Sequence, residues 1–61
     1  MFDLNKFIMD NLINGFGNYS FTKEQVSIFA VNYMAKGLLD EDDIIEINIK
    51  IEEIIANRVE D

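Results

Sequence analysis

Carboxylates are the side chains of this sequence with the greatest capacity for chemistry. Six of them form a candidate acidic surface in the second half of the chain: Asp40, Glu41, Asp42, Asp43, Glu46 and Glu53. Such a group could bind calcium, act as a general acid and base, or face a basic partner. A calcium loop of the EF-hand type requires glycine at its sixth position and glutamate at its twelfth. Counted from Asp40, these positions hold Ile45 and Ile51, so the sequence predicts no metal site.

The rest of the composition argues against catalysis. The sequence contains no histidine and no cysteine. This removes imidazole acid–base chemistry, the usual zinc ligands, thiolate nucleophiles and disulfides. There is no glycine-rich phosphate loop, and 61 residues leave little volume to enclose a carboxylate pair in a dry pocket. We therefore predict a protein that is not an enzyme and has no catalytic, cofactor-binding or metal-binding residues.

The net charge of −7 is distributed unevenly. Residues 1–39 carry equal numbers of acids and bases, so residues 40–61 hold the whole negative charge. This balance disfavours direct binding to nucleic acid or to an anionic membrane, and it favours a basic protein partner or no partner at all. No stretch approaches the roughly 18 apolar residues of a membrane span. The N-terminus lacks the pattern of a secretory signal, so we predict a cytoplasmic protein.

The sequence predicts one all-α domain that spans residues 1–61. Three helices are expected to position these side chains, at residues 3–14, 22–36 and 40–59, and the last of them is the longest. The middle helix has the clearest boundary signals. Thr22 and Gln25 have the spacing of a capping box, and Gly37 suits the residue that ends the helix. Residues 15–19, which include two glycines, are predicted to form the first loop.

The four consecutive acids fit the start of the third helix. Asp40 is the predicted N-cap, and the next three acids occupy the first turn, where unpaired N–H groups and the helix dipole stabilise negative charge. Isoleucines also alternate with polar residues from position 45 to 51, which is typical of a half-buried strand. Because the apolar spacing continues through Ile54, Ile55 and Val59, we favour a helix.

The predicted helices carry more apolar residues than one core-facing stripe requires. On the third helix Ile45, Ile49 and Ala56 form a second strip, hereafter the apolar strip. Ile28 and Val31 lie on the second side of the middle helix. A three-helix monomer of this size cannot cover every strip, although protein surfaces normally expose some apolar residues. We predict that these five residues mediate contact, and that self-association through the third helix completes the fold as a homo-oligomer. An apolar groove that receives another protein's helix is the other possibility.

An inhibitor is the alternative from another functional class. The six residues of the acidic surface could imitate a phosphate backbone and block a basic nucleic-acid-binding site on a host or defence protein. Binding of that kind should weaken sharply with salt. Self-association through the apolar strip should depend little on salt.

Part of the chain resembles a known family. The segment YSFTKEQV from Tyr19 to Val26, followed by Phe29 and by KGLLDED from Lys36 to Asp42, resembles the XkdX-like small phage proteins. Those proteins share an aromatic residue, a Thr-Lys-Glu helix start, an apolar helix, a glycine turn and a second acidic helix start. The resemblance covers about 25 residues. It implies a phage accessory or structural protein, in the virion or in the host cytoplasm. This chain departs from the family in its longer middle helix and in lacking the Tyr-x-x-Ile-Thr-Gly type of ending.

Overall fold

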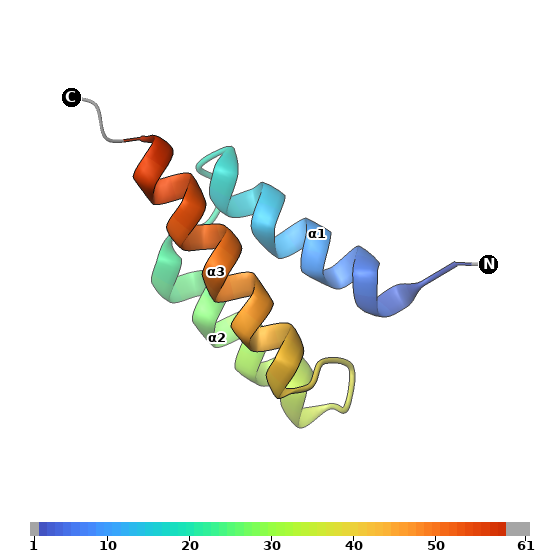
Figure 1. Cartoon of the computed structure of the whole chain (residues 1–61). Coiled ribbons are helices and arrows are strands. Elements are labelled where there is room, and N and C mark those ends of the chain that lie inside the picture. The colour runs from blue at the N-terminus through green and yellow to red at the C-terminus, as the bar shows by residue number, and fades with distance from the viewer. Residues whose placement is uncertain (1, 59–61) are drawn as a thin grey trace.

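The computed structural model describes residues 2–58 and contains three α-helices and no strand within that range (Figure 1). The helices are α1 (Leu4–Gly17), α2 (Lys23–Ala35) and α3 (Glu41–Asn57). The predicted all-α fold is confirmed, and α3 is the longest helix with 17 residues. The strand alternative for residues 45–51 is wrong because they lie inside α3. Val59, the last residue of the predicted third helix, lies outside the described residues.

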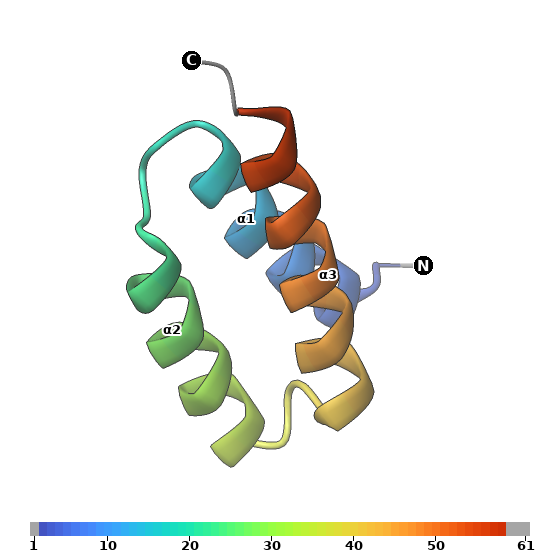
Figure 2. The ribbon, with the colours of Figure 1, turned by 60° about the vertical axis from the view of Figure 1, so that its left-hand side comes forward.

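The three helices pack around one apolar core. α2 runs opposite to α3, and α1 packs against both of them (Figures 1 and 2). Within the described residues the buried side chains are all apolar. The core contains Ile8, Met9, Leu12, Phe16, Val26, Ala30, Leu39, Ile47 and Ile51. Because every helix contributes to this set, the apolar face of each helix is stabilised mainly by tertiary burial.

Helix α1 ends later than the sequence pattern predicted. It continues to Gly17, three residues past its predicted end, so most of the predicted first loop is helical. Phe16 is only 5% exposed and belongs to the core. Gly15 lies so close to the ring of Phe21 that a Cβ atom there would overlap it. This packing outweighs the low helix propensity of the two glycines. The positive φ of the turn, 69°, is adopted by Tyr19 rather than by a glycine.

The predicted boundaries of α2 are confirmed by its hydrogen bonds. The Gln25 N–H donates to Thr22 Oγ1 over 3.1 Å, and the Thr22 N–H donates to Gln25 Oε1 over 2.8 Å. These reciprocal bonds form the predicted capping box. At the other end Gly37 has a φ of 80°. The Leu38 N–H donates to the Tyr33 carbonyl over 2.9 Å, which satisfies one of the terminal carbonyls of the helix.

Helix α3 begins with the cap predicted for it. The Asp43 N–H donates to Asp40 Oδ1 over 2.9 Å, and the Asp40 N–H donates to Asp43 Oδ2 over 3.1 Å. Glu41, Asp42 and Asp43 occupy the first turn. The four consecutive acids therefore start a helix, where its dipole stabilises their charge.

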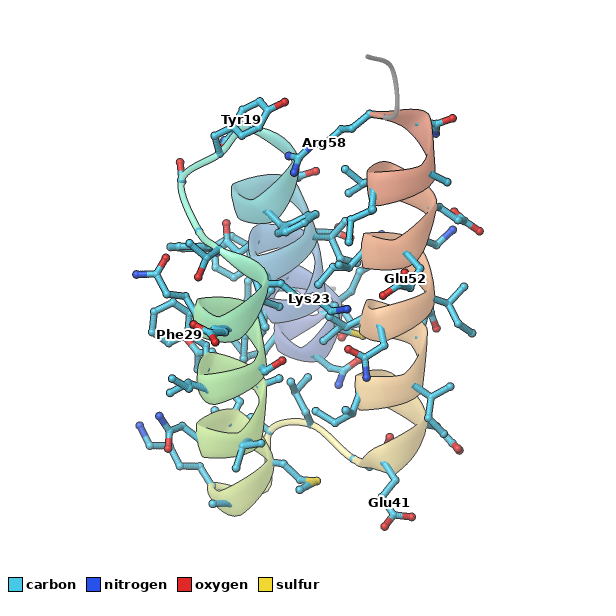
Figure 3. The ribbon with its side chains drawn as sticks, turned by 90° about the vertical axis from the view of Figure 1, so that its left-hand side faces the viewer. Tyr19, Lys23, Phe29, Glu41, Glu52 and Arg58 are labelled. Atoms are coloured by element: carbon cyan, nitrogen blue, oxygen red, sulfur yellow. The ribbon has the colours of Figure 1, made fainter. Side chains whose placement is uncertain are left out.

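Arg58 joins the C-terminal ends of α1 and α3. Its guanidinium lies 4.5 Å from the ring centroid of Phe16 and 4.1 Å from that of Tyr19 (Figure 3). Its Nη2 also donates to the Phe16 carbonyl over 2.7 Å. The Phe16 carbonyl also accepts from the Tyr19 N–H over 3.2 Å, so Arg58 adds a second donor at the end of α1. A cation at this position interacts favourably with the negative end of the helix dipole.

Candidate functional site

The apolar strip lies on the side of α3 that faces away from the core. At about 100° per residue, its three residues fall within about 40° of one another, opposite the fully buried Ile47. Ile45 and Ile49 are 55% and 52% exposed, and Ala56 is also exposed. They line a shallow depression together with Asn48, Glu52 and Glu53. The intramolecular core therefore leaves this face of α3 free.

The apolar surface continues from α3 onto α2. Val31, which is 55% exposed, lines a second depression with Met34 and Ile45. Because Ile45 borders both depressions, the apolar strip and Val31 form one continuous surface. Ile28 is 59% exposed but borders a different depression with Lys23, Glu24 and Ser27. The structure therefore brings together four of the five predicted contact residues and leaves Ile28 apart from them.

The six acids of the candidate acidic surface have different environments. Glu41, Asp42, Glu46 and Glu53 are exposed. Asp40 and Asp43 are committed to the cap of α3. Lys50 lies one turn after Glu46 and one turn before Glu53, so it interrupts the row of carboxylates on the side facing α1.

Asp43 also connects α3 to α1. Asn5 Nδ2 donates to Asp43 Oδ2 over 2.7 Å and to the Leu38 carbonyl over 3.1 Å. The hydrogen bond from Asn5, followed by that from the Asp40 N–H, lowers the pKa of the half-buried Asp43 below its ordinary value. Asn5 is separated from Asp43 by 38 positions, so no local sequence pattern predicted this contact.

We expect Asn5→Ala to raise the pKa of Asp43 toward the ordinary aspartate value, about 4. A depressed carboxyl pKa adds stability above the unfolded-state pKa, and this contribution disappears as the pH falls through the folded-state pKa. The variant should therefore be less stable near neutral pH and should lose less stability than the parent during acidification. NMR titration of the Asp43 carboxyl, with urea unfolding at several pH values, measures both effects. Asn11→Ala, the same change at an exposed asparagine of α1, is the control. An unchanged Asp43 titration in Asn5→Ala would contradict the assigned contact.

A second concave feature lies between α1 and α2, with a volume of about 470 Å³. Its aromatic wall includes Phe21 and Phe29, whose ring centroids are 5.2 Å apart in an edge-to-face arrangement. Asn11, Asn14 and Asn18 also line it. Neither of the aromatic residues predicted in the first loop, Phe16 and Tyr19, lines this cleft. Sequence periodicity did not predict it because it depends on how the two helices are placed.

Two kinds of site are not found within residues 2–58. No three acidic side chains in that part of the chain come close enough together to hold a metal ion. None of its helices is both long enough and apolar enough to cross a membrane.

No protein-family model, curated protein or solved structure matches this chain. The resemblance of residues 19–42 to XkdX-like phage proteins therefore stays a prediction. The exposed apolar surface on α3 and α2 is the feature from which a function can be argued.

Proposed function

We propose that this protein is a non-enzymatic protein-interaction module, and that its contact surface is the apolar strip together with Val31. One observation supports this proposal above the others. Ile45 and Ile49 are more than half exposed on a helix whose opposite face already fills the core. Burying one such side chain completely contributes roughly 1.5–3 kcal/mol. A partner that covers the strip would therefore gain a useful part of the free energy that association requires.

The surroundings of the strip suit contact rather than catalysis. Its borders are formed by exposed carboxylates and by Asn48, and the sequence supplies no histidine or cysteine to act with them. Both sequence-based hypotheses place a protein partner at α3. Self-association would use the apolar side chains, whereas an inhibitor of a basic protein would use the acids. In either case we propose a cytoplasmic protein, and an accessory protein in the host cytoplasm or the virion if a phage encodes it.

Substitution of the central strip residue tests the proposal. We expect Ile49→Asp to weaken association at least about 30-fold, because a charge in the centre of a contact costs about 2 kcal/mol or more. The free energy of unfolding of the monomer should change by less than about 0.5 kcal/mol, since the side chain is exposed. Association is measured in two ways: by light scattering of the protein over a dilution series, and by titration with a helical peptide.

Ile28→Asp is the matched control, because Ile28 is equally exposed but lies outside the strip. It should leave both measurements unchanged. Absence of association in both assays, or equal losses in Ile49→Asp and Ile28→Asp, would contradict the proposed contact surface.

A further inference from the structure

The charges around the apolar strip identify the kind of partner that fits it. Resting on the function proposed above, we propose that the strip receives a basic amphipathic helix from another protein, rather than a second copy of this chain. The partner helix would place an apolar stripe on Ile45, Ile49 and Ala56, and lysine or arginine side chains on both flanks.

The α3 residues on the flanks of the strip carry a single sign of charge. On a wheel of about 100° per residue, every charged residue of α3 within about 80° of the strip's centre is an acid. These are Glu41, Asp42, Glu46, Glu52 and Glu53. Lys50 lies further round, toward α1. The charged side chains that α3 places on both edges of the strip are therefore negative, and Lys23 of α2 offsets part of that charge at Glu52.

Lys23, the basic residue that α2 brings to this surface, already forms an ion pair with an acid of α3. Lys23 Nζ lies 2.7 Å from Glu52 Oε2, and Figure 3 shows the two side chains pointing toward each other between α2 and α3. Both side chains are more than half exposed, so this pair contributes little to stability. It nevertheless shows that Glu52 can accept a cation at the edge of the strip.

A second copy of the chain fits this arrangement poorly. In an antiparallel pair of α3 helices, each flank faces the same flank of the other copy, so Glu46 would face Glu53 of the other copy. In a parallel pair, the flank with Glu53 would face the flank with Glu52. Both orientations therefore bring carboxylates together, between molecules that each carry a net charge of −7. Such like-charge contacts are the usual means by which an interface rejects a wrong partner.

A basic amphipathic helix matches both the apolar strip and its acidic flanks. The strip from Ile45 to Ala56 extends about 16 Å, at about 1.5 Å per residue, which matches about three turns of a partner helix. Docking a helix into an apolar groove through residues at i, i+3, i+4 and i+7 is a recurring mode of recognition. Lysines beside such a stripe would lie against Glu52 and Glu53. Their attraction would raise the association rate and make the affinity sensitive to salt.

A set of designed peptides tests this inference on the full chain. The probe is a fluorescein-labelled leucine–lysine peptide of about 18 residues, with its leucines on one helical face. One control peptide has the same composition in scrambled order, and another has glutamate in place of lysine. Fluorescence anisotropy measures binding at about 0.05 M and 0.3 M salt. Light scattering measures the mass of the protein alone at the same concentrations.

We expect the basic striped peptide to bind at least about tenfold more tightly than either control peptide, a difference of about 1.4 kcal/mol. Ile49→Asp should abolish this preference. The double change Glu52→Lys with Glu53→Lys should weaken binding at least about tenfold and reduce its salt dependence. Ile28→Asp should have no effect. Because all four side chains are exposed, circular dichroism should show each variant to be folded.

Each contrary outcome has a separate meaning. A stable dimer that Ile49→Asp dissociates, without binding of the basic peptide, overturns the inference but leaves the proposed function intact. Equal binding of the striped and scrambled basic peptides overturns it in favour of the acidic inhibitor, because charge alone would then be recognised. If the glutamate peptide binds as tightly as the basic striped peptide, the proposed basic character of the partner is overturned. If the protein neither dimerises nor binds any peptide, the inference and the proposed function both fail.

Discussion

Ile47→Ala is expected to lower the free energy of unfolding by about 2–5 kcal/mol, the usual cost of truncating a buried isoleucine. Ile47 is only 1% exposed and lies in the middle of the core-facing side of α3. Its removal would leave a cavity among residues from all three helices. A domain of this size buries only about 60% of the surface of its unfolded chain. Because the total stability is then expected near the low end of about 5–15 kcal/mol, this variant should keep only about 0–3 kcal/mol of it.

Ile49→Ala provides the matched control, on the same helix and with the same chemical change. Ile49 lies on the opposite side of α3, so its truncation should change the free energy of unfolding by less than about 0.5 kcal/mol. Urea unfolding followed by circular dichroism measures both variants. The midpoint of Ile47→Ala should fall without a change in the slope of the transition. Equal losses at the two positions would contradict the assignment of core and exposed faces on α3.

Gly15→Ala is expected to destabilise the protein by about 1–3 kcal/mol, the usual cost of overpacking. Replacing an exposed glycine in the middle of a helix with alanine normally has the opposite sign, with a gain of about 0.5–1 kcal/mol. At position 15 the new Cβ would overlap ring atoms of Phe21. This ring is held against Phe29, and the Phe21 N–H donates to the Gly15 carbonyl over 3.0 Å. The backbone bond holds Phe21 beside Gly15, and its ring cannot move away without disturbing the contact with Phe29.

Gly17→Ala is the control for this substitution, since it makes the same change two residues later in α1. The nearest atom to a new Cβ there is Ile54 Cδ1 at 3.7 Å, an ordinary van der Waals distance. We expect the free energy of unfolding to stay unchanged or to rise by less than about 1 kcal/mol. The same urea measurement applies to both variants. A gain in stability from both alanines would show that Phe21 does not pack on Gly15.

The helix boundaries that depend on local bonds could be predicted from the sequence. The capping bonds of α2 join Thr22 to Gln25, and those of α3 join Asp40 to Asp43, each pair being three residues apart. Gly37 likewise ends α2 through its own backbone conformation. Such bonds form within one turn of the chain, so residue types at short spacing are sufficient to indicate them. The same locality explains why the consecutive acids were identified as a helix start.

Contacts between distant residues could be known only from the tertiary structure. Asn5 meets Asp43, and Arg58 meets the Phe16 carbonyl, across separations of 38 and 42 positions. The extension of α1 has the same origin, because the packing of Phe16 and Gly15 in the folded chain stabilises a helical turn that local propensity disfavours. Residue spacing along one helix contains no information about the partner that another helix will present.

The candidate contact surface combines both kinds of information. Helical periodicity alone placed Ile45, Ile49 and Ala56 on a second strip and gathered the acids beside them, since these relations belong to one helix. Periodicity also marked Ile28 and Val31 on α2 as equivalent candidates. The structure separates them, because Val31 lies beside Ile45 and Ile28 does not. Which apolar side chains stay uncovered, and which of them join into one surface, depends on how α1, α2 and α3 are oriented when they bury their shared core.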